Sequence, residues 1–234
     1  FKDLKGAVDT VIDSIQIGLP LSRIELLDEV QIKAINQYKK ASHEVGPTLF
    51  VEIQGTPLGV KEQSEIFKEI ANTNNALKFQ WSDRSEEIEV LWSARHDAYY
   101  AALSLAPGKK AFTTDICVPI SKLTDCILET KKDIEKSNII APIVGHVGDG
   151  NFHLIMLLDP ENEKEVSEAK TLNDKLVNRA LKMEGTSTGE HGIGIGKKEY
   201  LKIEQGLSVD VMSQIKKAID PKNIMNPGKI FEID

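Results

Sequence analysis

Short strand patterns alternate with helix patterns along this 234-residue chain, and their order restricts the fold more than any other feature of the sequence. Short apolar or alternating runs predict strands at 22–27, 48–54, 78–81, 112–118, 139–146 and 151–158. Apolar residues at helical spacing predict helices at 5–16, 29–40, 61–71, 85–104, 121–134 and 163–182. The resulting order of strands and helices is typical of split β-α-β units. It predicts an α+β fold, with an antiparallel sheet, helices on one face, and two ferredoxin-like halves that share the sheet.

A doubly wound parallel sheet is the alternative architecture. That fold carries a glycine-rich phosphate-binding turn between its first strand and the following helix. The sequence has no such turn at the expected place, so the antiparallel sheet is favoured.

The charge balance and the apolar runs narrow the classes of partner. Lys and Arg number 29 against 36 Asp and Glu, and the two signs are interspersed, which argues against a nucleic-acid partner. The longest apolar runs, at 139–144 and 154–158, are far shorter than the ~18–20 residues of a membrane-spanning helix. One bridge between Cys117 and Cys126 could not staple a chain of this size, so both are predicted to be free thiols.

Two histidines flank a predicted turn between the strands at 139–146 and 151–158. Asp149-Gly150 is a preferred dipeptide for a two-residue hairpin, and centring the turn there places His146 opposite His153. Opposed residues share a sheet face with Cβ atoms about 4.5–5.5 Å apart. The two imidazoles are therefore expected either to ligate one metal ion or to form a hydrogen-bonded pair in a polar pocket.

A glycine-dense stretch at 185–196 contains the pair Glu190-His191. Its spacing matches neither a dinucleotide-binding loop nor a Walker A loop. In an extended segment neighbouring side chains point in opposite directions, so Glu190 is a candidate third ligand while His191 faces another wall of the same cavity. The alternative is that the stretch is a flexible connector.

Arg95 projects from the apolar stripe of the predicted helix at 85–104, three residues after Trp92 and four before Tyr99. A guanidinium in such a place needs an anionic partner. A substrate carboxylate would satisfy it. The alternative is a structural role, either in an internal salt bridge or through packing of the Arg95 stem on Trp92.

These residues lie in motifs that resemble a known family. The motifs are Trp-Ser-Ala-Arg-His at 92–96, Thr-Asp-Ile-Cys-Val-Pro at 114–119, Gly-His-Val-Gly-Asp-Gly-Asn-Phe-His at 145–153, Gly-Glu-His-Gly at 189–192 and Met-Asn-Pro-Gly-Lys at 225–229. They resemble, in this order, the C-terminal substrate domain of FAD-linked D-2-hydroxyacid dehydrogenases. The similarity is greatest to the eukaryotic, cytochrome-linked branch that acts on D-lactate.

The resemblance implies a domain organisation. Residues 21–234 would form the FAD-linked oxidase C-terminal domain, and residues 1–20 a leading helix from the junction with a preceding domain. The family's N-terminal FAD-binding domain has no counterpart in this chain, which begins at Phe1 and is expected to be a piece of a longer protein.

The resemblance also implies residue roles. The expected roles are divalent-metal ligands, with zinc as the expected ion, for His146, His153 and Glu190; general base for His191; substrate contacts for Arg95 and Tyr99; and proximity to the flavin for Asn226. Relatives that act on larger diacids carry a lysine where this chain has Thr113 and Thr114, a departure that favours a monocarboxylate.

The function implied by the resemblance is oxidation of D-lactate to pyruvate, with electrons passing to FAD and then to cytochrome c. By the same resemblance the expected location is mitochondrial. The chain by itself is expected to be inactive. The alternatives are a D-2-hydroxyglutarate or glycolate dehydrogenase of the same family, or a flavin-free metal-binding module.

Overall fold

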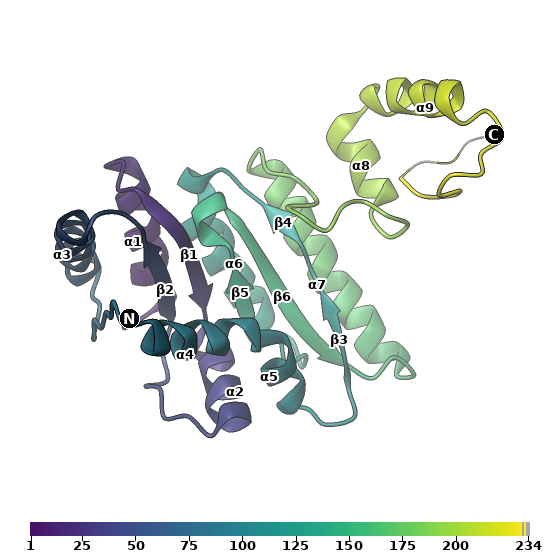
Figure 1. Cartoon of the computed structure of the whole chain (residues 1–234). Coiled ribbons are helices and arrows are strands. Elements are labelled where there is room, and N and C mark those ends of the chain that lie inside the picture. Colours follow the sequence, from purple (N-terminus) through teal and green to yellow (C-terminus); the bar gives the residue numbers. More distant parts are fainter. Residues whose placement is uncertain (231, 233–234) are drawn as a thin grey trace.

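An antiparallel sheet forms the centre of the computed structural model, which describes residues 1–230 and 232 (Figure 1). In the described part the sheet has six strands, in the order β2-β1-β5-β6-β3, and β4 also pairs with β6. The strands are β1 (Leu21–Leu27), β2 (Thr48–Ile53), β3 (Lys110–Thr113), β4 (Ile116–Cys117), β5 (Ile143–Gly145) and β6 (Asn151–Leu158). All of these pairs are antiparallel, so the predicted α+β class and antiparallel sheet are confirmed.

Most of the helices predicted from the sequence are present, with bounds close to those expected. The observed helices are α1 (Leu4–Gln16), α2 (Glu29–Lys39), α3 (Pro57–Thr73), α4 (Ser85–His96), α5 (Ala98–Ser104), α6 (Leu123–Glu135), α7 (Glu163–Lys182), α8 (Lys198–Gln205) and α9 (Ser208–Ile219). Side chains of Asp3, Asp28 and Asn162 accept backbone N–H groups at the starts of α1, α2 and α7, which is the usual reason for a helix to begin at such residues.

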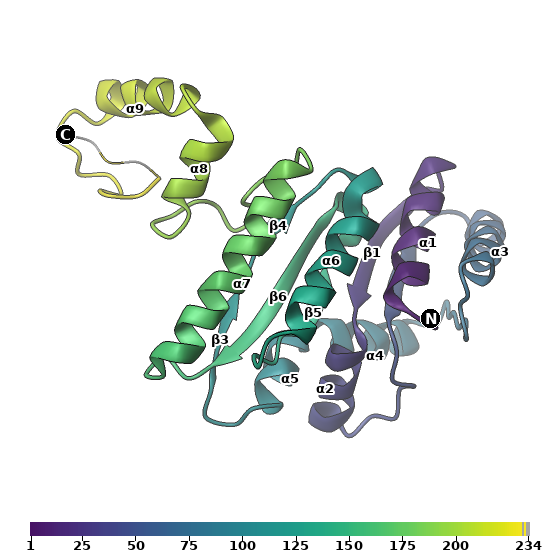
Figure 2. The same ribbon diagram turned by 180° about the vertical axis from the view of Figure 1, so that it is seen from behind.

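Helices cover both faces of the sheet. Figure 2 shows α1, α6 and α7 on one face, where their apolar sides form a large core with the inward residues of β1, β5 and β6. On the other face α2, α4 and α5 cover part of the sheet around a second core (Figure 1). The helix layer predicted for one face of the sheet corresponds to α1, α6 and α7. Helices α2, α4 and α5 cover only part of the other face, so a site can lie on the uncovered part.

The split β-α-β unit is present in the second half of the chain. Strands β3 and β5 both pair antiparallel with β6, so they run parallel on either side of it, with α6 in the connection. The first half is simpler, because β1 and β2 pair directly although α2 lies between them in the sequence.

The connection between β5 and β6 is not the predicted two-residue hairpin. His153 pairs with Val144 and not with His146. Val147–Asp149 instead form a 3-10 turn, and Gly150 follows with a φ of 79°. A Cβ on Gly150 would lie 2.1 Å from the Val118 carbonyl oxygen, so this turn is packed against β4 and requires glycine.

The predicted strand at 78–81 and the single helix at 85–104 are both wrong. Residues 78–81 form no strand. The helix is broken at Asp97, which pairs with Lys39 of α2, and the chain then turns into α5. Buried Ala98, Ala101 and Ala102 let α5 pack closely on α2. Tertiary packing on α2 therefore overrides the continuous helical pattern.

The remaining features concern the thiols and the end of the chain. Cys117 and Cys126 are free, as predicted. Helices α8 and α9 stand away from the sheet (Figures 1 and 2). Large apolar side chains on these helices and on the turn between them are exposed, among them Ile203, Leu207 and Ile215. Within residues 1–230, no helix combines the length and apolar character that crossing a membrane requires.

Candidate active site

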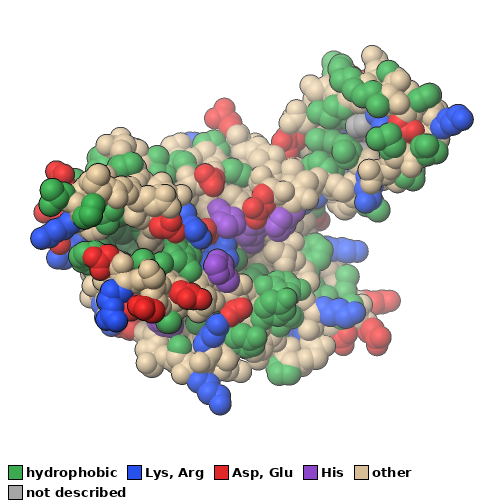
Figure 3. All heavy atoms as spheres, viewed as in Figure 1, with side chains coloured by type: hydrophobic (Ala, Val, Ile, Leu, Met, Phe, Trp, Pro, Cys, Tyr) green, Lys and Arg blue, Asp and Glu red, His purple; other side chains and the backbone are tan. Residues whose placement is uncertain are grey.

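Three histidines and a glutamate meet on the sheet face that carries α2, α4 and α5. His146 directly follows β5, and His153 lies within β6 on the same face as Ile155. Glu190 and His191 come from the glycine-rich loop after α7. In Figure 3 the histidine side chains gather in the middle of this face, with acidic and basic side chains beside them. Elements distant in sequence are therefore brought together here.

One oxygen of Glu190 faces both imidazoles of the predicted pair. Glu190 Oε1 lies 3.5 Å from His146 Nε2 and 3.2 Å from His153 Nε2. Ligand atoms of the three residues lie within 4.8 Å of one another. The rings of His146 and His153 are nearly perpendicular, with centroids 5.9 Å apart. The structure thus brings the three predicted ligand residues together, although the strand register that suggested the histidine pair is wrong.

Hydrogen bonds on the opposite side of each ring determine which nitrogen is free. His153 Nδ1 lies 2.9 Å from the Thr114 carbonyl oxygen, and His146 Nδ1 lies 2.7 Å from Glu25 Oε1. A carbonyl and a carboxylate only accept, so in each neutral ring Nδ1 donates and Nε2 keeps its lone pair. The hydrogen bond to Glu25 raises the pKa of His146, whereas burial lowers the pKa of His153.

This donor set fits a divalent ion of the zinc type. Neutral imidazole nitrogens and a carboxylate oxygen are usual zinc ligands, and three protein ligands leave a position open for a small molecule. Ligating histidines generally donate their other ring N–H to a carboxylate or a backbone carbonyl. His146 and His153 show both arrangements.

His191 lies beside the three candidate ligands. Its ring is stacked on that of His153, with centroids 5.0 Å apart and planes at 10°. Its Nε2 lies 3.4 Å from Glu190 Oε1, and about half of the side chain is exposed. The ring is therefore accessible from outside while being held against the buried histidine.

Asp115, which is absent from the predicted site residues, anchors this loop. The carboxylate is buried and accepts the Thr188 hydroxyl at 2.8 Å, the His191 backbone N–H at 3.0 Å and the Glu190 N–H at 3.2 Å. Lys197 Nζ lies 3.1 Å away. Burial alone would raise the pKa of Asp115, but these hydrogen bonds and Lys197 hold it well below its ordinary value.

The anchoring favours a built segment over a flexible connector for residues 188–191. Gly189 adds to it, because a Cβ there would lie 2.0 Å from Asn151 Nδ2 at the start of β6. The sequence does carry a signal for Asp115, because this acid lies inside the apolar stretch at 112–118. A buried acid needs several hydrogen-bond donors, so such a position indicates a structural or functional role.

We expect Asp115→Asn to destabilise the chain by about 2–4 kcal/mol, because an amide nitrogen would then face backbone N–H groups that only donate, and Lys197 would lose its buried anionic partner. Urea unfolding measures the loss, and hydrogen exchange at residues 188–191 locates it. Asp149→Asn is the matched control, since Asp149 is exposed at the neighbouring turn. Equal stability of the two variants would contradict the anchoring role.

Arg95 forms the internal salt bridge that the sequence left open. Its Nε donates to Glu25 Oε2 at 3.0 Å, and both side chains are largely buried. In the described part of the chain its two terminal nitrogens have no hydrogen-bond partner. The guanidinium therefore keeps free donors beside the histidine cluster while its position is fixed by Glu25.

The other two predicted site residues are not in the cluster. Tyr99 lies exposed on α5, edge-on to Tyr100 with ring centroids 5.6 Å apart. Asn226 lies exposed in the segment that follows α9. The roles proposed for both remain predictions.

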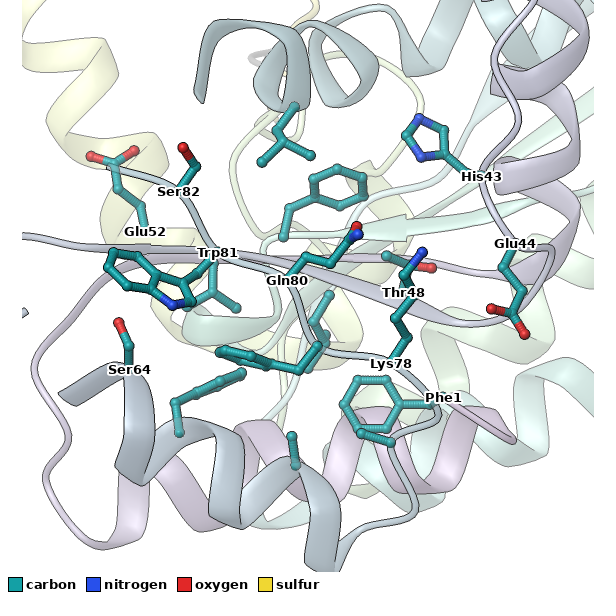
Figure 4. A pocket seen from close by; sticks show the side chains of 18 of the residues that line it. Phe1, His43, Glu44, Thr48, Glu52, Ser64, Lys78, Gln80, Trp81 and Ser82 are labelled. Carbon is teal, nitrogen blue, oxygen red and sulfur yellow. The ribbon is translucent and has the colours of Figure 1, made fainter. Parts of the chain in front are cut away.

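A separate cavity of about 480 Å³ lies on the outer side of β2 (Figure 4). It is bounded by β2, α3 and the segment at 76–82, with the labelled Phe1, Lys78 and Trp81 around it. Exposed His43 lines this cavity, whereas His146, His153 and His191 do not. The cavity is thus distinct from the candidate site.

Comparison with known proteins identifies relatives over the whole chain. The chain is 47% identical over 234 residues to "Probable D-lactate dehydrogenase, mitochondrial" of Danio rerio, covering 100% of this chain and 47% of that protein. It is 42% identical over 232 residues to "D-lactate dehydrogenase [cytochrome], mitochondrial" of Arabidopsis thaliana, covering 99% and 41%. The chain spans less than half the length of these relatives.

Solved structures support the fold and a family description supports the assignment. A 4-ethylphenol oxidase from Gulosibacter chungangensis matches with a TM-score of 0.73 at 14% identity, covering 98% of this chain and 52% of that one. The family "FAD linked oxidases, C-terminal domain" matches residues 1–230. The chain therefore belongs to the FAD linked oxidases, as their C-terminal domain.

Proposed function

We propose that this chain is the substrate- and metal-binding part of a flavin-dependent D-2-hydroxyacid dehydrogenase that oxidises D-lactate to pyruvate. The observation that carries the proposal is the meeting of His146 Nε2, His153 Nε2 and Glu190 beside the free donors of Arg95. A 2-hydroxy acid carries its hydroxyl on the same carbon that bears the carboxylate, which suits a cation site next to a guanidinium. The names of the relatives support D-lactate as the substrate.

In the proposed mechanism His146, His153 and Glu190 hold a divalent ion, with zinc as the first candidate. When bound, the ion would lower the pKa of a neighbouring hydroxyl, and FAD would supply the hydride acceptor. The chain's own contribution is to present two unprotonated ring nitrogens and one carboxylate oxygen from a fixed sheet and an anchored loop.

Arg95 and His191 have separate tasks in this proposal. The free guanidinium nitrogens of Arg95 bind the substrate carboxylate, where Arg favours planar anions with two parallel hydrogen bonds. The half-exposed imidazole of His191 accepts the hydroxyl proton. Neutral imidazoles are suited to this task near pH ~7. Tyr99 is proposed to contact the substrate from α5.

The choice of D-lactate over a larger diacid rests on the end of β3. Thr113 and Thr114 stand there, and the Thr114 hydroxyl accepts the Leu154 backbone N–H at 2.8 Å. Lys109 is engaged with Glu165. A second carboxylate would therefore find no lysine at 113 or 114. Glycolate and D-2-hydroxyglutarate remain the alternative substrates to be compared.

We further propose that residues 21–234 work against an FAD-binding domain that precedes residues 1–20 in the longer protein. Exposed apolar side chains on α8 and α9 support a partner surface of this kind, and Asn226 is exposed in the same part of the chain. A mitochondrial location and transfer of electrons to cytochrome c are proposed from the names of the relatives.

Thermal melts of the chain test the proposal. Zinc at about 100 times its Kd is expected to raise the Tm by roughly 5–10 °C, and D-lactate a further amount only when zinc is present. Acetate, which lacks the hydroxyl, is the control, and glycolate and D-2-hydroxyglutarate test the alternatives. If neither zinc nor D-lactate changes the Tm, the proposed site is wrong.

Turnover by the chain alone separates the flavoenzyme from a flavin-free metal enzyme. Because residues 1–230 match only the C-terminal domain of the family, we expect the 234-residue chain to bind D-lactate without oxidising it, even with zinc and FAD added. Pyruvate formation is measured directly. Pyruvate produced by the chain would contradict the proposed division of labour between two domains.

A further inference from the structure

Glu25 is a buried acid that touches both halves of the candidate site. It lies in β1 with its side chain only 7% exposed. Its Oε2 accepts Arg95 Nε at 3.0 Å, and its Oε1 accepts His146 Nδ1 at 2.7 Å. Each carboxylate oxygen therefore holds a different proposed functional residue, and the two residues come from α4 and from the end of β5.

We infer that Glu25 is the positioning residue that fixes His146 as a ligand through Nε2 and ties it to Arg95. This inference rests on the proposed function, in which His146 ligates a cation and Arg95 binds the substrate carboxylate. By holding both residues, Glu25 would fix the spacing between the cation and the guanidinium. The spacing would select acids whose hydroxyl is on the same carbon that bears the carboxylate.

The chemistry of the two contacts requires a carboxylate. Arg95 Nε is always protonated and only donates, so it needs an acceptor. His146 Nδ1 donates only while the ring keeps its proton on that nitrogen, which leaves Nε2 free toward Glu190. A carboxylate offers two acceptors and accommodates both donors at once, whereas an amide offers one acceptor and one donor.

Glu25→Gln is therefore expected to act on His146 in a defined way. The amide oxygen should face Arg95, because the guanidinium cannot accept a hydrogen bond. The amide nitrogen then faces His146 Nδ1, which can accept only if the ring proton moves to Nε2. That nitrogen is the one turned toward Glu190, so the substitution should remove a metal ligand without removing the histidine.

The experiment measures the ring proton and zinc affinity in the 234-residue chain. The hydrogen bond to Glu25 raises the pKa of His146, so nitrogen-15 NMR of the metal-free chain is recorded above the pH at which this ring has lost its second proton. The spectra should show the remaining His146 proton on Nδ1 in the native chain and on Nε2 in Glu25→Gln. Zinc affinity of the variant should fall about 10–100-fold, as is typical when a group that orients a metal ligand is changed.

Glu52→Gln is the matched control, because Glu52 pairs with Arg23 on the neighbouring strand at a more exposed position. It should leave the His146 proton and zinc affinity unchanged. A Glu25→Gln chain that keeps the Nδ1 proton and native zinc affinity would overturn the inference. If the Glu25→Gln chain does not fold, the NMR measurement on the native chain still tests the inference. A His146 proton found on Nε2 in the native chain would overturn it. A native chain with an Nδ1 proton but no zinc binding would instead count against the proposed metal site.

Discussion

Replacing His153 by alanine is expected to lower zinc affinity by more than about 100-fold, a larger loss than the ~10–100-fold typical of changes outside the ligand shell. The substitution removes the most buried of the three candidate ligands and leaves only His146 and Glu190. The Thr114 carbonyl also loses its donor, which should cost about 1–3 kcal/mol of stability. Zinc titration and elemental analysis after dialysis measure the loss of metal.

The matched control for this prediction is His43→Ala. His43 is exposed, and its hydrogen bonds to Asn36 use only backbone atoms, which alanine keeps. The control should bind zinc as the native chain does, and His146→Ala should lose zinc as His153→Ala does. Urea unfolding must remain cooperative in His153→Ala, because a loss of metal through unfolding would not count. Native zinc content in a folded His153→Ala chain would remove His153 from the ligand set.

For the histidine pair, the sequence predicted which residues come together but not the local backbone that brings them together. Two histidines on either side of a turn predicted a paired site, and the structure places the rings together. The register that supported the prediction is wrong, because Val147–Asp149 form a 3-10 turn that packs against neighbouring strands. Periodicity fixes which face a strand residue occupies, but packing of the turn fixes where His146 points.

The buried acids Glu25 and Asp115 were missed for a physical reason. Each lies inside an apolar strand run, where the sequence gives its burial but not the donors that satisfy it. Those donors come from residues 70 and 121 positions away for Glu25, and from up to 82 positions away for Asp115. Such partners are set by the tertiary fold, so local sequence patterns do not contain them.

The predicted helix at 85–104 is a second case in which tertiary packing, and not the local sequence pattern, decides the structure. Its apolar spacing predicts one helix, yet the chain bends at Asp97 because α5 packs on α2 through small alanine side chains. The bend matters for the site, since it separates Arg95 on α4 from Tyr99 on α5. The antiparallel sheet, α7 and β6 were predictable, because their patterns are long and uninterrupted.

His191→Ala is expected to lower kcat for D-lactate by about 10²–10⁴-fold in the flavoenzyme that joins this chain to its FAD-binding domain, the usual contribution of a general base. Zinc content should change little, because His191 lies outside the group formed by His146, His153 and Glu190. Steady-state oxidation of D-lactate and elemental analysis of the same preparation test both parts.

Two comparisons separate a proton acceptor from a ligand at position 191. His191→Gln keeps a polar side chain beside Glu190 but has no basic nitrogen near neutral pH, so it should be nearly as slow as His191→Ala. His96→Ala is the control, since His96 is exposed on α4, and it should retain native turnover. His191, His153 and Asp115 also form a second group with ligand atoms within 4.8 Å. If turnover and zinc content fell together in both variants of His191, this second group would be the metal site, and the proton would have to be taken by another residue.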